Sequence, residues 1–288
     1  LDAAIPIIKG YHVSNPLDKN DLKYLYNLIG IRLIVSITKS MISRSKFPLN
    51  DYLQISEKSA WILLKKWTGV NSEFAHYRFR EACDFEPHPN NLNFLKWTKN
   101  NKISFSTLFP SISKTEVYNL DLSVESTWVG RKEEFDNLEI FQHKIALIQK
   151  KYPNKIIAGG YMENRPIYTS VKYDRIGNEG NEKRCLHLGL DFWLPEKTPI
   201  HLPYDGEIEI VSNDVGEKTF GPMVVVKHKN KNSSFYTLYG HLSVKSLTKI
   251  HVGDKLKKGD CVGWIGDLNE NGNWASHLHF QILLTLLD

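Results

Sequence analysis

The chain has 288 residues, of which 41% are hydrophobic and 24% are charged, and its formal net charge is +5. This length is enough for about two domains, and the composition is that of a globular protein. Lysines and arginines are dispersed among acids, and no basic stripe carries interleaved aromatic rings, so we expect no nucleic-acid partner. The odd number of cysteines and the absence of a C-x-x-C motif predict free thiols and favour a reducing, cytoplasmic compartment.

The most apolar stretch of the sequence extends from Leu22 to Ile42. Arg32 and Lys39 interrupt it, so it lacks the roughly 18 uninterrupted apolar residues of a membrane span. No secretory signal peptide is visible either. The sequence therefore predicts no membrane partner.

Residues 1–86 are expected to be helical, because their apolar residues recur at helical spacing. The segment DKND (Asp18–Asp21) offers capping residues before a long apolar helix, which we expect to be buried on most sides. Two further segments, Ser56–Trp67 and Ser72–Cys83, each begin with a serine suited to capping and continue at helical spacing.

Residues 87–155 are expected to be a connector that packs on a neighbouring region. Its clearest element is an amphipathic helix over Arg131–Tyr152, whose apolar positions follow the helical period. These positions are Phe135, Leu138, Phe141, Ile145 and Ile148.

From residue 156 to residue 288 the period of the apolar pattern changes to two, and short strand-like segments follow one another between turn clusters. The segments are too close together for crossover helices, so they predict antiparallel sheets. The segment KHKNK (Lys227–Lys231) is expected to be a solvated loop. The predicted fold class is thus a multidomain α+β protein, with a helical N-terminal region and an all-β antiparallel C-terminal domain.

Two segments of the β region carry residues suited to metal chemistry. In LHLGLDFW (Leu186–Trp193), alternation places the leucines on one face and His187, Gly189 and Asp191 on the other. The glycine leaves space between imidazole and carboxylate for a metal with bond lengths of about 2.0–2.2 Å. In SHLHFQILL (Ser276–Leu284), two histidines one residue apart share a strand face.

The two segments together offer three metal ligands and one further imidazole. Three protein ligands with an open fourth position are typical of catalytic zinc, and a ligand set of nitrogen and oxygen suits Zn²⁺ without excluding other divalent ions. A further histidine, His241, lies in YTLYGHLS (Tyr236–Ser243) where a strand leads into a turn. Paired with His277, it could transfer protons to and from a metal-activated water and a leaving amine.

The segments HLGLDFWLPEKTPIHLPYDGEI, YTLYGHLS, KLKKGDCVGWIGD and SHLHFQI together resemble the lysostaphin-like, LytM-type zinc metallopeptidases of family M23. The resemblance covers Leu186–Ile282, in the order found in the family. It implies a compact antiparallel β fold and hydrolysis of peptide bonds in bacterial cell-wall crosslinks, next to glycine or D-alanine. The sequence departs from the family in DLNENGNWAS, where Trp274 stands in place of a run of small residues, and this predicts a differently shaped groove.

The same resemblance implies a role for each histidine and for the aspartate. His187, Asp191 and His279 would bind one Zn²⁺ per chain, and His241 and His277 would be the catalytic imidazoles. The predicted substrate is a peptide or a peptidoglycan-like polymer. The alternative is a non-catalytic LytM-like binding module, which is disfavoured because such modules typically lose metal ligands.

The helical region carries a second resemblance. GYHVSNPLDKNDLKYLYNLIGIRLIVSITKSMISRS resembles the C-terminal helical part of aminoglycoside-phosphotransferase and choline-kinase-like enzymes, but the H-x-D-x-x-x-x-N loop of those enzymes is absent. The resemblance implies a piece of a larger fusion of kinase-like, peptidase-like and aminotransferase-like modules. A further alternative therefore makes the β domain an accessory part of such a small-molecule kinase.

Overall fold

The computed structural model describes residues 1–288 except 51, 53–54, 115, 178–179, 231–232 and 288. The chain forms two compact units. We call Leu1–Lys96 the helical unit, to which the last residues from Leu286 also belong, and Trp97–Thr285 the sheet unit. The division of the chain into separate domains 1–86, 87–155 and 156–288 stays a prediction.

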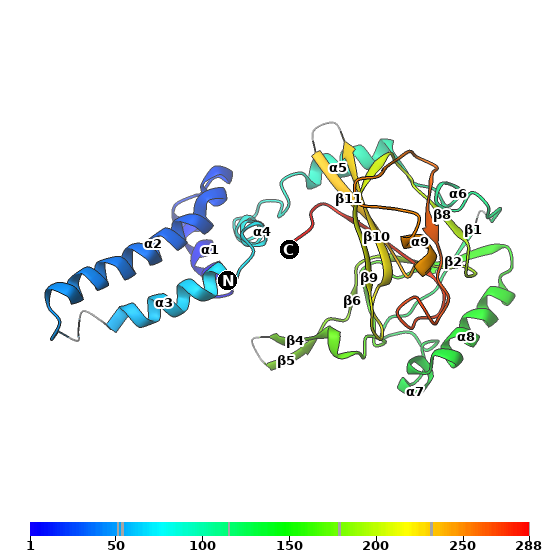
Figure 1. The fold of residues 1–288 in the computed structure, drawn as a ribbon, viewed down its shortest axis with the longest axis horizontal. Helices are drawn as coiled ribbons and strands as arrows, with labels where there is room; N and C mark the ends of the chain where they lie inside the picture. Colours follow the sequence, from blue (N-terminus) through cyan, green and yellow to red (C-terminus); the bar gives the residue numbers. More distant parts are fainter. Residues whose placement is uncertain (51, 53–54, 115, 178–179, 231–232, 288) are drawn as a thin grey trace. The chain divides into compact units, whose positions relative to one another are not determined.

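The helical unit consists of α-helices, as expected, and Figure 1 draws them in blue to cyan. Asp18 begins the long second helix with a capping box, because its side chain accepts from the backbone of Asn20 and Asp21 while the Asp21 side chain accepts from the Asp18 amide. The fourth helix is capped by Asn71 and not by the predicted Ser72. The helices are α1 (Ala4–Ser14), α2 (Lys19–Lys46), α3 (Ile55–Thr68), α4 (Ser72–Ala82) and α5 (Asn91–Asn100), the last of which reaches into the sheet unit.

The expectation that α2 is buried on most sides is wrong. Only Leu22, Ile37 and Ser40 of this helix are buried, since the small core of the unit forms around Trp67 and Phe79 and touches one side of α2. By length and composition α2 could cross a membrane. The core helices of soluble proteins and signal sequences meet the same criterion. The expected absence of a membrane partner stays a prediction.

The sheet unit is built on one eight-stranded sheet in the order β1-β2-β7-β14-β11-β10-β9-β12. Its neighbouring strands are antiparallel, as expected for residues 156–288, except that β2 also pairs in parallel with β1, which comes from the predicted connector. The sheet is thus rich in antiparallel pairs and has helices beside it. The strands are β1 (Glu116–Asn119), β2 (Lys155–Gly159), β7 (Leu190–Trp193), β9 (Gly206–Asp214), β10 (Gly221–Asn230), β11 (Ser233–Gly240), β12 (Lys255–Leu256) and β14 (Leu278–Leu283).

Short elements complete the sheet unit. Three two-stranded pairs, β3–β6, β4–β5 and β8–β13, lie outside the main sheet. Their bounds are β3 (Glu163–Asn164), β4 (Asp174–Gly177), β5 (Gly180–Lys183), β6 (Leu186–His187), β8 (Pro199–His201) and β13 (Cys261–Trp264), and the remaining helices are α6 (Phe105–Leu108), α7 (Lys132–Asp136), α8 (Leu138–Lys151), α9 (Val244–Leu247) and the 3₁₀ turn η2 (Val171–Tyr173).

The predicted amphipathic helix over residues 131–152 is present but divided. The Asn137 side chain accepts from the Ile140 amide and begins α8 anew after α7. The apolar face of α8 packs with strands of the main sheet in one core cluster, which includes Phe141, Ile145, Ile157 and Trp193. The predicted connector therefore supplies part of the sheet unit, including the edge strand β1.

Of the segment Lys227–Lys231, which was predicted as a solvated loop, the residues up to Asn230 are instead part of the sheet, and Lys231 lies outside the described residues. Lys227–Asn230 lies in β10 and pairs with β11, with His228 opposite Phe235. The residues Lys227 and Lys229 point away from the core, whereas His228 is only 1% exposed. Alternation of lysines with buried residues is typical of a strand, and charge density alone misled the prediction.

Candidate metal centre and active site

Strand register brings the two predicted motifs together. Strand β14 lies between β7 and β11, and this pairing places His279 opposite Asp191 on one side and opposite Gly240 on the other. His187 is held on β6 by the pair β3–β6, where it lies opposite Glu163. The ligand motifs are about 90 residues apart in sequence, so only this pairing makes them neighbours.

The segment Leu186–Trp193 is not the single strand that the sequence predicts. It is interrupted between β6 and β7, and the leucines of its apolar face are exposed to about the same extent, with Leu186 46% and Leu190 40% exposed. On the polar face, His187 is 4% exposed and Asp191 is 1% exposed. The polar face is thus buried around the candidate ligands, whereas the apolar face is buried at Phe192, which is 3% exposed, and partly exposed at its leucines.

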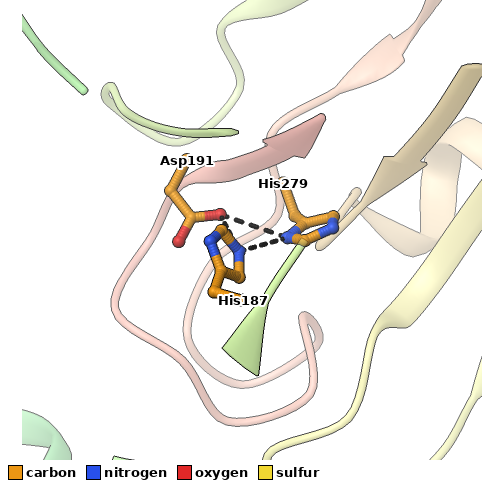
Figure 2. Close-up of side chains that lie close together, drawn as sticks. All are labelled: His187, Asp191 and His279. Carbon is orange, nitrogen blue, oxygen red and sulfur yellow. Dashed lines mark hydrogen bonds and ion pairs between the residues drawn. The ribbon is translucent and has the colours of Figure 1, made fainter. Parts of the chain in front are cut away.

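The three predicted ligands converge on one point (Figure 2). His187 Nε2 lies 2.9 Å from His279 Nδ1 and 3.3 Å from Asp191 Oδ1, and His279 Nδ1 lies 3.2 Å from the same oxygen. Donor atoms around a tetrahedral ion with bonds of about 2.0–2.1 Å are separated by about 3.3 Å. The donor set and its spacing thus fit a zinc ion.

Hydrogen bonds to the other ring nitrogens fix which atoms face the centre. His187 Nδ1 donates to the Gly160 carbonyl at 2.7 Å, and His279 Nε2 lies 3.2 Å from Gln281 Oε1, which can only accept. Each imidazole therefore presents a lone pair, not a proton, toward Asp191. Two lone pairs and a carboxylate repel one another unless a cation lies between them, so the arrangement favours a metal.

The two further histidines lie beside these ligands. Their Nδ1 atoms donate to backbone carbonyls, His241 to Asn271 at 2.8 Å and His277 to Ala275 at 2.6 Å, so that both Nε2 atoms carry lone pairs. The two ring centroids are 4.4 Å apart, and His277 Nε2 is 3.6 Å from Asp191 Oδ1. Together they form a pair of proton acceptors next to the candidate metal position.

Burial keeps this pair of imidazoles neutral. It lowers the pKa of His277 to about 4, and burial together with His277 and His279 holds the pKa of His241 well below its ordinary value. Burial by itself would raise the pKa of Asp191, but His187, Arg165 and His277 hold it well below its ordinary value. At neutral pH the site therefore combines an ionised carboxylate with imidazoles able to accept protons.

Gly189 occupies the position that the sequence reasoning gave it, between His187 and Asp191. A Cβ atom there would lie 2.5 Å from His279 Cε1, closer than real contacts allow. The space left by the missing side chain is thus filled by the third ligand's ring. Any side chain at this position would push His279 away from the other two ligands.

A groove opens onto the centre, and aromatic side chains line it. They include Tyr168, Tyr173, Phe220 and Trp274. Trp274, which departs from the family pattern, is 7% exposed and donates from Nε1 to the Thr219 carbonyl at 3.0 Å. Its indole packs edge-on against Tyr168, with ring centroids 6.2 Å apart.

Sequence reasoning missed residues that support the site from other elements. Trp193 stacks on His277 with ring centroids 4.3 Å apart, and Gly160, Gln281 and Asn271 accept the hydrogen bonds described above. Arg165 pairs with Asp191 from the segment after β3. The position of Gln281 on the histidine face of its strand could have indicated that it lies near the site. Nothing in the local sequence indicates this for Gly160 or Arg165.

The cluster of His187, Asp191 and His279 could hold a metal ion, and it lies in the part of the chain that resembles known proteins. Residues 185–285 match the model of peptidase family M23. This part of the chain is therefore similar to the M23-type, LytM-like peptidase domains. The metal ligands and catalytic histidines within it stay assignments to be tested.

Three curated relatives each match about a third of this chain. An uncharacterized metalloprotease of Haemophilus influenzae is 35% identical over 95 residues, 33% of this chain and 18% of the relative. The cell division protein DipM of Caulobacter vibrioides is 34% identical over 33% of this chain and 14% of its own length, and the peptidoglycan DD-endopeptidase ShyA of Vibrio cholerae is 33% identical over 34% and 20%. This chain thus spans a fifth or less of each of these three proteins.

Among solved structures, a zinc-containing peptidase from Vibrio cholerae is 26% identical, with a TM-score of 0.29, over 39% of this chain and 31% of its own. The catalytic domain of lysostaphin from Staphylococcus simulans is 25% identical, with a TM-score of 0.29, over 35% and 71%. The resemblance of the helical unit to kinase-like enzymes, and the fusion that it implies, stay predictions.

Proposed function

We propose that the sheet unit is a zinc metalloendopeptidase that binds one Zn²⁺ per chain through His187, Asp191 and His279. The observation that carries this proposal is the spacing of the three donor atoms, 2.9–3.3 Å, with both imidazoles turned so that bare nitrogens face the carboxylate. A zinc ion bound there supplies a Lewis acid that polarises a carbonyl and lowers the pKa of a water molecule.

The chain's own residues supply the proton transfers in this proposal. His277 and His241 are neutral and have free Nε2 atoms, so either can take a proton from the attacking water, and the imidazolium formed in this way can give that proton to the departing amine. The carbonyls of Ala275 and Asn271 hold the two rings in this tautomer. Trp193 stacked on His277 prevents that ring from turning away.

The proposed substrate is a peptide crosslink of the peptidoglycan type, cleaved next to glycine or D-alanine. Two observations support it: the match to family M23, and relatives that are named as peptidoglycan endopeptidases. The aromatic groove is consistent with an extended peptide carrying small side chains, because Trp274 and Tyr168 narrow it beside the catalytic histidines.

The proposal is tested by metal analysis of the purified chain, followed by incubation with glycine- and D-alanine-containing peptides and with purified peptidoglycan. We expect about one zinc per chain and cleavage that a chelator abolishes and added Zn²⁺ restores. A chain that binds zinc but cleaves none of these substrates would favour a binding module over an enzyme. A chain that takes up no divalent metal would refute the metal assignment itself.

A further inference from the structure

A buried arginine lies directly behind the candidate metal ligand Asp191. Arg165 Nη1 donates to Asp191 Oδ2 at 2.6 Å, and Arg165 Nε donates to Glu163 Oε2 at 2.6 Å. The side chains of Arg165 and Asp191 are 3% and 1% exposed, and that of Glu163 is 11% exposed. Both ion pairs are thus buried. The effect of a buried ion pair on stability depends on its geometry as well as on its charges.

This arrangement assigns different tasks to the two carboxylate oxygens of Asp191. Oδ2 is bound to the guanidinium, whereas Oδ1 faces His187 Nε2 at 3.3 Å and His279 Nδ1 at 3.2 Å. A guanidinium is rigid and planar, so when Nε is held by Glu163 the Nη1 atom is held in a fixed place, and with it the Oδ2 atom that it binds. Glu163 is held in turn, because its Oε1 accepts from the Leu122 amide at 2.8 Å.

The backbone around Gly160 is shaped to admit this arginine. Gly160 has a φ of +106°, and a Cβ atom there would lie 2.0 Å from Arg165 Nη2 and 2.7 Å from His187 Nδ1. The same glycine's carbonyl accepts from His187. The turn from Gly160 to Arg165 thus contacts both ligands of the His-x-x-x-Asp motif, one through a carbonyl and one through a guanidinium.

One nitrogen of the guanidinium is left without a hydrogen bond within the described part of the chain. Arg165 Nη2 is buried and has no hydrogen-bond partner among the residues that the structure describes. An unpaired buried donor destabilises a fold, so stability by itself does not account for an arginine here. Glu163, Arg165 and Gly160 all precede residues 185–285, the part of the chain that matches the peptidase family.

We infer that Arg165 is a positioning residue for the metal site: anchored by Glu163, it holds Oδ2 of Asp191 so that Oδ1 alone is presented to the metal. The inference rests on the proposed function, since it assigns Asp191 as a ligand. It extends the metal site to a segment outside the family-matched residues. Partners that orient a metal ligand are typically worth about 10–100-fold in metal affinity.

The direction in which zinc affinity changes distinguishes a positioning role of Arg165 from a purely electrostatic one. A cation that acted only by its charge would repel Zn²⁺, so Arg165→Met would bind zinc more tightly. If the guanidinium positions Asp191, Arg165→Met binds zinc more weakly, by about 10–100-fold. Arg165→Lys keeps the charge but cannot span Glu163 and Asp191 with one ammonium group, so it also binds zinc more weakly. Affinity is measured by competition with a chromophoric chelator and needs no substrate.

Lys218→Met is the matched control. Lys218 is another buried cation of the sheet unit, which donates to Thr169 Oγ1 at 2.7 Å and to the Ile167 carbonyl at 3.0 Å and also pairs with Asp136. It contacts none of the candidate ligands, so its removal should lower the melting temperature and leave zinc affinity unchanged. An equal loss of zinc affinity in this control would mean that instability, not positioning, weakens the site, and would overturn the inference.

Glu163→Gln provides a second, milder variant should the Arg165 variants fail to fold. Glutamine can still accept from the Leu122 amide but no longer holds Arg165 by charge, so zinc affinity should fall by less than in Arg165→Met. The inference is overturned, and the proposed function is not, if Arg165→Met binds zinc as tightly as the wild type or more tightly, or if Arg165→Lys keeps the wild-type affinity. If Glu163→Gln is the one variant that folds, an unchanged zinc affinity overturns the inference in the same way. A wild-type chain that binds no zinc overturns the proposed function and this inference together.

Discussion

The helical unit and the sheet unit differ in the polar side chains that they bury. The helical unit leaves large apolar side chains of α2 and α3 at its surface, such as Ile31, Ile34 and Trp61, and the buried polar or charged residues described in it are Ser40 and Arg80. The sheet unit buries four imidazoles and a carboxylate around one point, each with a hydrogen-bond or ion-pair partner. Such burial is costly unless each group is paired, so the sheet unit is where chemistry is expected.

The largest expected effect separates the two histidines of the His-x-His motif within the sheet unit. His279→Ala should lose zinc and peptide cleavage together, because His187 and Asp191 by themselves hold zinc poorly. His277→Ala should keep zinc and lose about 10²–10⁴-fold in turnover, the usual contribution of a positioned acid or base. Zinc content and cleavage rate are measured on the same preparations, and His241→Ala should behave like His277→Ala.

The opposite pattern, in which His277→Ala loses the zinc and His279→Ala keeps it, would show that the two roles are exchanged. Thermal melts of each variant serve as the control for folding. They are needed because His277 stacks on Trp193 in the core of the sheet unit.

A core mutation tests whether the two units are energetically separate. Phe79 is fully buried in the helical unit, and Phe79→Ala should destabilise that unit by about 3–5 kcal/mol. Zinc affinity should not change, because the ligands all lie in the sheet unit. Far-UV circular dichroism follows the helices while chelator competition follows the metal.

Phe109→Ala is the matched mutation in the sheet unit. Phe109 is also fully buried, and its ring lies 5.4 Å from that of Phe192, the neighbour of Asp191. This variant should lower both the melting temperature of the sheet unit and its zinc affinity. A loss of zinc affinity in Phe79→Ala would refute the separation of the two units.

Acid should destabilise the metal-free sheet unit through its buried neutral histidines. Burial lowers the pKa of His277 from 6.5 to about 4. Below pH 6.5 the unfolded chain therefore binds a proton that the folded chain does not, and the free energy of unfolding falls until about pH 4, by about 3 kcal/mol for this residue. Denaturant unfolding in the presence of a chelator, across this pH range, measures the loss.

His228 provides an independent check on β10, which is separated from the ligand strands β7 and β14 by β11. Burial lowers its pKa below 6.5, while Nδ1 donates to the Asp205 carbonyl at 2.9 Å and Nε2 lies 2.7 Å from Thr237 Oγ1. His228→Gln should reduce the loss of stability below pH 6.5. A wild-type slope in this variant would place the whole acid sensitivity in the candidate active site.

The smallest effect is expected for an exposed ion pair of the sheet unit. Arg175 pairs with Glu182 across β4–β5, and the two side chains are 60% and 37% exposed. Surface pairs contribute about 0–1 kcal/mol, so Arg175→Ala should change the free energy of unfolding by less than about 1 kcal/mol and leave zinc affinity unchanged. A loss as large as that of the buried Arg165 pair would mean that burial does not govern these ion pairs.

Much of the secondary structure could be predicted because it depends on local periodicity. The cap at Asp18, the amphipathic face of α8 and the strands after residue 156 follow from spacings of a few residues. The predictions that were wrong have different causes. Nothing local distinguishes the exposed sides of α2 from those of a buried helix. At Lys227 the alternation typical of a strand was present, but the charge density was given more weight.

The sequence by itself determined the residues that could form the site and the strand faces on which they lie, since alternation along a strand is fixed by backbone geometry. Only the tertiary structure decided which residues of each face are withdrawn from solvent. On one face of β7, Trp193 packs with α8 and Asp191 contacts Arg165. On the other face Phe192 is buried in a core cluster, and Leu190 is left partly exposed. Contacts between residues far apart in sequence, such as Arg165 with Asp191, depend on strand pairing and therefore have no local signature.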